Sequence, residues 1–408
     1  MSKRINNSCQ VLIVGGGVSG AAAAVAAARC GMQTVLVERD SFLGGAGYSG
    51  LHQYICGLYL NDAAIPVETL NKGIVREIVG LLNKLSPQRT IKKIGQVYVL
   101  PYSGEDLAFA FSSLCANEKN IKVFFNASAA EVKKKSRTIT EVVFYQSGIM
   151  HRIYPGILID CTGTGDISAM AGAGFELSPS GKRQLAGFTV RLKGLKDSSE
   201  ILSIKVPYYL AQAANRKLLP AYLRFTAFSR GETAGVGFCK INVGGSDSSR
   251  REETVRKDAL KMIKYLAKKL PSFKDAYIAE TSLRVMEREG RRVCGEYTLT
   301  EDDVLNAGKF DDGVVKNSWP IEIWDKKKGT IYKYLKPGDY YEIPFRCLKA
   351  RGIHNLLLAG RCISVTRGAL GSSRVIGTCI SLGEEAGKAA AYYLEKGRYP
   401  FEDKFSLK

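Results

Sequence analysis

The stretch CQVLIVGGGVSGAAAAVAAARCGMQTVLVERD, residues 9–40, decides the fold. It has the order of a strand, a glycine turn, an alanine-rich helix and a second strand. The continuous apolar run VLIV is typical of a parallel strand that is covered on both faces. Gly31 ends the predicted helix after Cys30, and QTVLVE follows as the second strand. This order predicts the first half of a Rossmann-like α/β fold.

Three glycines follow the first strand in the pattern G-x-G-x-x-G. Gly15 allows the tight turn, Gly17 lets a pyrophosphate approach the backbone, and Gly20 lets the helix and strand pack closely. The helix starts at Val18 and Ser19, where unpaired N–H groups and a partial positive charge attract a phosphate. A glycine-rich strand–helix turn without a ligand is the alternative for this motif alone, but the flanking strands favour a dinucleotide site.

The residues after the second strand favour FAD over a nicotinamide dinucleotide. Glu38 ends that strand, where a carboxylate accepts hydrogen bonds from an adenosine ribose. Arg39 lies next to this carboxylate in the sequence, and Gly44 and Gly45 form a second glycine loop soon afterwards. A nicotinamide dehydrogenase does not need a glycine loop at this position, so we predict FAD.

Several ordered motifs resemble the FAD-dependent oxidoreductase family. The early match is ERDSFLGGAGYSGL, residues 38–51, and the late match is NLLLAGRCISVTRGALGSSRVIGTCISLGEEAGKAAA, residues 355–391. Segments 159–176, 288–305 and 341–348 resemble family segments in the same order, so the resemblance spans nearly the whole chain. It implies a glutathione-reductase-like FAD-binding domain of class α/β, with a parallel sheet and a β meander. It also implies an inserted α+β substrate or cap domain.

The resemblance implies further contacts with FAD. Residues 162–166 resemble a T-G motif that closes over the dinucleotide, with Asp166 capping the next helix. Residues 371–397 are expected to form one helix that packs on the sheet and starts beside the flavin pyrimidine edge, where its dipole would stabilise negative charge. The predicted contacts are Ala130, Thr162, Gly163, Asp166, Gly360, Arg361, Ser372, Ser373, Arg374, Val375 and Ile376. For Arg374 the alternative is a surface ion pair with Glu384 or Glu385.

The cofactor motifs lie at both ends of the chain, so the FAD-binding domain must be discontinuous. We predict that it comprises residues 1–58, 105–185 and 345–408. Residues 59–104 and 186–344 would form the substrate or cap domain, in which residues 255–273 have helical periodicity with a lysine-rich outer face. The pattern G-x-G-x-x-S at 163–168 is not followed by a strand that ends in an acid. A separate NAD(P) domain is therefore not expected.

Four residues are candidates for substrate chemistry. His52 follows Gly45 by seven residues and is either an acid/base residue facing the flavin or a structural residue. Arg288 and Arg292 lie in segment 283–304, which is either a helix with arginines on one face or a strand with its charges outward. Arg346 precedes the last predicted FAD strand. Arginine binds carboxylates in a bidentate manner, so these residues suggest an anionic or polyhydroxylated substrate.

The composition excludes several other classes of protein. No apolar run reaches the roughly 18 residues of a membrane span, and glycines interrupt the only N-terminal apolar run that resembles a signal peptide. The ten cysteines include no C-x-x-C pair, which argues against an iron–sulfur cluster, a metal site or a disulfide framework and favours a cytoplasmic location. The net charge of +20 has three possible explanations: a charged surface that only contacts water, attraction of an anionic substrate or membrane face, or binding of nucleic acid. Nucleic acid is disfavoured because no recognition motif is present.

These features together predict an FAD-dependent oxidoreductase. We expect hydride transfer between flavin N5 and a small organic molecule. The alternatives are a flavoprotein electron-transfer subunit and an FAD-dependent enzyme that modifies nucleic acid. Covalent and non-covalent attachment of FAD are both compatible with the sequence, as are a monomer and a homo-oligomer.

Overall fold

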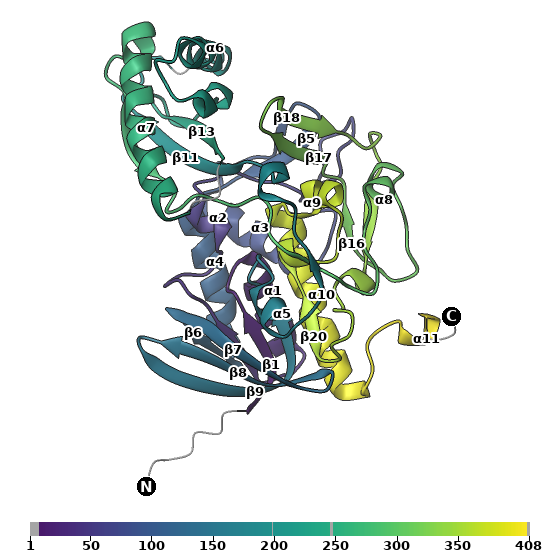
Figure 1. Cartoon of the computed structure of the whole chain (residues 1–408). Coiled ribbons are helices and arrows are strands. Elements are labelled where there is room, and N and C mark those ends of the chain that lie inside the picture. Colours follow the sequence, from purple (N-terminus) through teal and green to yellow (C-terminus); the bar gives the residue numbers. More distant parts are fainter. Residues whose placement is uncertain (1–7, 198, 245–247, 406–408) are drawn as a thin grey trace.

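The computed structural model describes residues 8–197, 199–244 and 248–405, and its centre is a seven-stranded sheet (Figure 1). The strand order is β6-β2-β1-β9-β8-β7, and β20 also pairs with β9. Five strands are parallel: β1 (Ser8–Val14), β2 (Thr34–Val37), β6 (Ile121–Phe124), β20 (Leu356–Leu358) and the end of β9 (Ile149–Asp160). Strands β2 and β20 and the ends of β1 and β9 are buried, as expected for a sheet covered on both faces, whereas the edge strand β6 is partly exposed.

The first half of β9 belongs to an antiparallel meander with β8 (Thr138–Gln146) and β7 (Ala127–Lys135). This is the meander that the sequence predicts, and it extends the parallel sheet at the bottom of the molecule in Figure 1. The sheet therefore joins a Rossmann-like half to a meander through one long strand.

Two long helices of small residues, α1 (Val18–Arg29) and α10 (Ile376–Lys396), lie against each other beside the sheet (Figure 1). A Cβ atom on Gly383 would overlap the backbone of Ser19, and one on Gly387 would overlap the carbonyl of Ala23. The glycines thus let the two backbones approach closely. The sequence predicts tight packing on the sheet for the second helix, whereas most of its contacts are with α1.

A second hydrophobic core lies in a separate lobe, at the upper left of Figure 1. Its antiparallel sheet has the order β12-β13-β11-β14 and is covered by two long helices. The bounds are β11 (Ala186–Lys193), β12 (Ala227–Arg230), β13 (Gly237–Val243), β14 (Tyr277–Thr281), α6 (Leu202–Asn215) and α7 (Ser248–Lys269). Cys239 and Ile241 of β13 are fully buried in this core. Because side chains alternate along a strand, Lys240 between them lies on the other face of the sheet, away from this core.

The remaining elements lie outside these two sheets. The strands are β3 (Tyr54–Ile55), β4 (Lys92–Ile94), β5 (Val97–Pro101), β10 (Phe175–Glu176), β15 (Arg292–Val293), β16 (Gly313–Asn317), β17 (Ile321–Asp325), β18 (Gly329–Lys333) and β19 (Tyr341–Pro344). The helices are α2 (Ala46–Ser49), α3 (Ile74–Leu85), α4 (Gly104–Asn117), α5 (Asp166–Met170), α8 (Glu301–Leu305), α9 (Arg367–Ser373) and α11 (Glu402–Phe405). Among all the described helices, none is both long and apolar enough to cross a bilayer.

Two local predictions are wrong. Residues 371–397 do not form one helix: α9 ends at Ser373, Val375 is extended, and α10 begins at Ile376. Segment 283–304 is neither a continuous helix nor a continuous strand, because β15 and α8 are the only regular elements in it. The predicted domain boundaries stay a prediction, and their parts at 1–7, 198, 245–247 and 406–408 lie outside the described residues.

Candidate active site

The first glycine motif forms a tight turn with one open face. Gly15 has φ +100°, and a Cβ on it would overlap the carbonyl of Cys161. A Cβ on Gly20 would overlap the carbonyl of Gly15, so this position holds α1 against β1. At Gly17 no atom lies within 4 Å of the place a Cβ would take. The backbone at Gly17, just before α1, therefore has open space beside it, whereas Val18 is buried.

The second glycine loop lies directly on the first. The amide of Gly44 donates to the carbonyl of Gly16 at 2.9 Å, and a Cβ on Gly45 would lie 2.9 Å from Gly17 Cα. The carboxylate of Glu38 accepts hydrogen bonds from the amides of Gly16 and, at 2.8 Å, Asp40. Burial raises the pKa of Glu38. The buried carboxylate therefore ties both loops together beside the open face.

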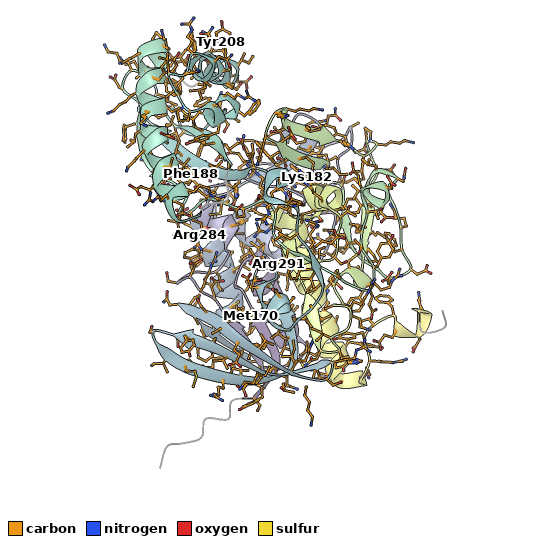
Figure 2. The ribbon with its side chains drawn as sticks, in the orientation of Figure 1. Met170, Lys182, Phe188, Tyr208, Arg284 and Arg291 are labelled. Atoms are coloured by element: carbon orange, nitrogen blue, oxygen red, sulfur yellow. The ribbon has the colours of Figure 1, made fainter. Side chains whose placement is uncertain are left out.

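Two of the predicted FAD contacts, Arg39 and Ala130, are exposed to solvent. The side chain of Arg39 is 66% exposed and lies 4.0 Å from Asp40. Asp40 is instead held by Arg284 at 2.6 Å, which reaches down from the junction with the lobe (Figure 2). Ala130 is exposed on β7.

A fully buried carboxylate that sequence reasoning missed organises the T-G segment. Asp160 accepts hydrogen bonds from the amide and hydroxyl of Thr162, at 3.0 and 2.7 Å, and from the amide and hydroxyl of Ser168, at 2.9 and 2.6 Å. The signal for it was an acid at the end of the apolar strand GILID. Gly163 takes a left-handed conformation, with φ +71°, and its carbonyl accepts a hydrogen bond from Arg361 at 2.7 Å.

Asp166 does not cap the following helix as predicted. The N-cap of α5 is Gly165, without a side-chain cap. The Asp166 carboxylate instead pairs with Arg291 at 2.8 Å and accepts a hydrogen bond from Thr164 at 2.5 Å. Arg291 lies beside α5 in Figure 2, so this ion pair fixes the T-G segment to segment 283–304.

The C-terminal segment that contains Gly360 and Arg361 lies next to the first glycine motif. Gly360 has φ +81°, and a Cβ on it would lie 2.6 Å from the Ser19 hydroxyl. A Cβ on Gly47, in α2 directly after the second glycine loop, would lie 3.4 Å from Val18 and 3.8 Å from Ile376. The predicted cofactor residues at 15–20, 44–45, 162–166, 360–361 and 372–376 therefore belong to adjoining segments.

The end of α9 and the start of α10 contain buried hydroxyls without a partner among the described residues. The hydroxyl of Ser372 is used structurally, donating to the carbonyl of Trp319 at 2.5 Å and lying 2.8 Å from the Tyr341 hydroxyl. The hydroxyls of Ser373 and Thr378 are buried and have no partner among the described residues. Buried polar groups are nearly always hydrogen-bonded, so these atoms and the open face at Gly17 fit a bound dinucleotide.

A cationic cluster lies between this surface and the lobe. We define the cationic cluster as Lys240, Arg288, Arg374 and their carboxylate neighbour Glu322. The indole of Trp324 lies at its centre. Its ring centroid is 4.0 Å from the Arg288 guanidinium and 4.6 Å from the Lys240 ammonium, and its N–H donates to Glu322 at 2.7 Å. The cluster thus contains three cationic side chains and one carboxylate.

The charges in the cluster strongly perturb one another. Burial, and then the nearby Arg288, lower the pKa of Lys240 to about 8. Burial, and then Arg374, lower the pKa of Arg288 to about 9. Burial alone would raise the pKa of Glu322, but the surrounding cations lower it below its ordinary value, so Glu322 is ionised.

The structure places His52 beside the cationic cluster, which already contains the candidate Arg288. The other two candidates, Arg292 and Arg346, lie elsewhere. Burial, and then Lys240, Arg288 and Arg374, lower the pKa of His52 to about 3, so this imidazole is neutral. Arg292 instead pairs with Glu289 at 3.1 Å and Glu176 at 3.3 Å.

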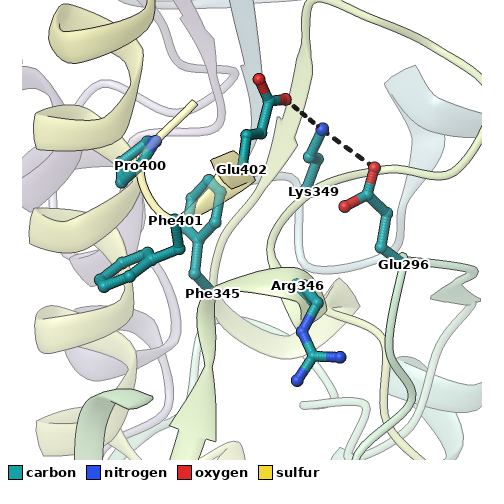
Figure 3. Close-up of a pocket in the computed structure, with 7 residues that line it drawn as sticks. All are labelled: Glu296, Phe345, Arg346, Lys349, Pro400, Phe401 and Glu402. Carbon is teal, nitrogen blue, oxygen red and sulfur yellow. Dashed lines mark hydrogen bonds and ion pairs between the residues drawn. The ribbon is translucent and has the colours of Figure 1, made fainter. Parts of the chain in front are cut away.

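Arg346 forms a bidentate ion pair with Asp312, at 3.0 and 3.1 Å. It also lines a pocket of about 270 Å³ near the C-terminus (Figure 3). Sequence reasoning missed Lys240, Glu322 and Trp324, which come from strands with no motif.

These features define the class of protein as one with a Rossmann-like dinucleotide-binding fold, and comparisons with solved structures support this fold. Similar solved structures include a geranylgeranyl bacteriochlorophyll reductase-like protein from Thermoplasma acidophilum, with 13% identity, coverage of 96% of this chain and 80% of that one, and TM-score 0.51. The p-nitrophenol 4-monooxygenase of Pseudomonas putida has 10% identity, coverage of 96% and 81%, and TM-score 0.50. The anhydrotetracycline hydroxylase of Streptomyces rimosus has 10% identity, coverage of 97% and 64%, and TM-score 0.52. At these identities the likeness shows the fold alone.

The family is shown by the sequence. The profile of the FAD dependent oxidoreductase family matches residues 10–403. A search of curated proteins found no match. The chain belongs to the FAD-dependent oxidoreductase family, which confirms the predicted fold class, family and cofactor, FAD.

Proposed function

We propose that this oxidoreductase transfers hydride between flavin N5 and a small anionic organic molecule bound at the cationic cluster. The observation that carries this proposal is the imbalance of charge in the cluster, where three cationic side chains share one carboxylate, Glu322. Burying a charge without a partner is costly, so a cluster of this kind favours binding of an anion. A polyhydroxylated substrate would leave the imbalance uncorrected.

Two arginines would bind the anion. One terminal nitrogen of Arg288 and the Nε of Arg374 are buried and have no hydrogen-bond partner among the described residues. Guanidinium groups form short, bidentate hydrogen bonds with carboxylates and phosphates. Arg288 is held in place by its hydrogen bond to the carbonyl of Leu185 and by its contact with the Trp324 ring.

Lys240 would transfer the proton that accompanies hydride transfer. When bound, FAD supplies the hydride acceptor or donor at N5. A group whose pKa lies near the working pH is the most effective acid or base, and the pKa of Lys240 is about 8. The neutral imidazole of His52 can accept a hydrogen bond but adds no positive charge.

The same geometry disfavours the two rival functions. An electron-transfer subunit without a substrate of its own does not need a buried anion site beside the predicted flavin contacts. An enzyme acting on nucleic acid would present its cations on an exposed surface, whereas Arg288 is 6% exposed.

Steady-state kinetics with matched substrates test the proposal. A panel of organic acids and their neutral amides is screened for turnover, and kcat/KM is measured for Arg288→Gln and for Arg398→Gln, an exposed control. Loss of one partner of a buried charge pair costs about 2–5 kcal/mol, so we expect Arg288→Gln to lower kcat/KM for an acid by at least roughly thirtyfold. The control should retain full activity. Equal turnover of acids and amides would contradict the proposal.

A further inference from the structure

A second pocket adjoins the cationic cluster. It has a volume of about 300 Å³, and its walls include Thr164, Arg183, Gln184, Leu185, Glu289 and Lys326. We call it the side pocket. Two of its residues also touch the cluster: the Gln184 side-chain oxygen accepts a hydrogen bond from Arg374 at 3.5 Å, and the Leu185 carbonyl accepts one from Arg288. Gln184 and Leu185 therefore connect the side pocket to the cluster.

The amide nitrogen of Gln184 has no hydrogen-bond partner. Gln184 is 4% exposed, and its side-chain oxygen accepts hydrogen bonds from Arg374 and, at 3.4 Å, from the Trp324 amide. Its Nε2 is buried and unpaired among the described residues. Leaving a buried donor unsatisfied costs about 1–3 kcal/mol, which an acceptor in the side pocket would recover.

The charges that line the side pocket also favour an acceptor. The carboxylates are already paired: Glu289 with Arg292 and, at 3.5 Å, Arg367, and Glu287 with Arg251. Arg183 and Lys326 contact only backbone carbonyls among the described residues, at 2.8 and 3.5 Å. The wall therefore offers two cations and an amide donor with no free carboxylate beside them.

We propose that the side pocket binds a second anionic group of the same substrate, so that the substrate class is a dianion with two separated acid groups. One acid group binds Arg288 and Arg374, and the other binds Arg183, Lys326 and Gln184. This inference rests on the proposed function, because it extends the anion site described there. The shared residues Gln184 and Leu185 fix the separation of the two groups.

Binding of dicarboxylates of increasing length tests the inference. The affinity of the FAD-loaded protein for unbranched α,ω-dicarboxylates and for monocarboxylates of equal length is measured by calorimetry. Linking two groups makes the second binding event intramolecular, so one length of dicarboxylate should bind at least tenfold more tightly than its monocarboxylate. Arg183→Gln with Lys326→Gln should remove this advantage and leave monocarboxylate affinity unchanged.

A matched control and a separate variant distinguish the outcomes. Lys327→Gln with Lys328→Gln changes two exposed lysines on the same turn that do not line the side pocket, and should have no effect. If no dicarboxylate binds more tightly than its monocarboxylate, while Arg288→Gln weakens both, the second anion site is wrong and the proposed function stands. If Arg288→Gln weakens neither, the proposed function itself fails. An advantage of dicarboxylates that survives the Arg183 and Lys326 changes would also overturn the inference.

Discussion

At the scale of single residues, the chemistry depends on side chains whose charge is set by their neighbours. Lys240 shows this most clearly, because an ordinary exposed lysine at this position would be fully protonated at neutral pH. Its place between the indole of Trp324 and two arginines instead brings its pKa to about 8. This shift is the reason that we propose Lys240 as the residue that exchanges a proton with the substrate.

The pH dependence of substrate binding tests the role of Lys240. Its positive charge is fully present well below pH 8 and is lost as the pH rises through its pKa of about 8. We therefore expect KM for an anionic substrate to rise above pH 8, by roughly tenfold per 1.4 kcal/mol of lost attraction. Lys240→Arg should keep KM low until Arg288, whose pKa is about 9, loses its charge. Lys240→Met should raise KM below pH 8 and match the unchanged protein well above it. A KM that stays flat through pH 8–10 would exclude the proposed role.

The glycines of the first motif give a second prediction at this scale, because two of them differ in their surroundings. A Cβ at Gly17 would meet no protein atom, whereas one at Gly20 would overlap the Gly15 carbonyl. Gly17→Ala should therefore leave the thermal stability of the FAD-free protein unchanged and weaken FAD binding at least tenfold. Gly20→Ala should lower that stability by about 1–3 kcal/mol. FAD titration and thermal unfolding of both variants measure the two effects, and equal loss of stability in both would contradict this account.

At the scale of elements, the packing of α1 against α10 is the contact that joins the two ends of the chain. Small residues allow it, and glycines at 383 and 387 are required where the backbones are closest. The same contact places α10, whose Thr378 hydroxyl has no partner among the described residues, against Ser19 of the first glycine motif. A change in this packing should therefore affect the FAD site as well as stability.

Two glycine-to-alanine changes test this contact. Gly383→Ala would overlap the Ser19 backbone, and overpacking of this kind costs about 1–3 kcal/mol. Gly80→Ala, in the interior of α3, meets no atom and should stabilise the protein by about 0.5–1 kcal/mol. Denaturant unfolding of both variants gives the comparison. Equal stability of the two would show that α1 and α10 do not pack this closely.

Sequence reasoning predicted elements where local physics determines the structure and missed contacts that only the fold creates. The apolar strand before Gly15, the turn and α1 follow from local patterning and were predicted. The break between α9 and α10 was missed, because no proline marks it and the run Gly-Ser-Ser at 371–373 was interpreted as part of a helix of small residues. Lys240 was missed because it alternates with buried residues on a strand, and only the tertiary fold brings that strand to Arg288 and Arg374.

At the scale of the whole molecule, the cationic cluster joins two hydrophobic cores. Arg374 comes from the part that contains the seven-stranded sheet, and Lys240 comes from the sheet of the lobe. The lobe also holds half of the net charge, because residues 186–285 contain 19 Lys and Arg against nine Asp and Glu. A lobe of this sign next to the site should attract anions before they bind.

The dependence of the reaction on salt tests this attraction. Screening by salt weakens long-range attraction, so kcat/KM for an anionic substrate should fall severalfold between low and physiological ionic strength. Changing the exposed Lys257, Lys261 and Lys264 of α7 to glutamate should lower kcat/KM at low salt and leave kcat unchanged. A neutral substrate serves as the control. Salt-independent kcat/KM for the anion would argue against a role for the lobe charge.

The most direct test of the central claim is the anaerobic reduction of bound FAD by an organic acid and by its neutral amide. The absorbance of the flavin is followed after rapid mixing, with the substrate carrying either hydrogen or deuterium at the carbon that is oxidised. The account predicts that the acid bleaches the flavin, that deuterium slows the bleaching, and that the amide reacts far more slowly. Bleaching by acid and amide at the same rate, or no reduction by any acid, would contradict it.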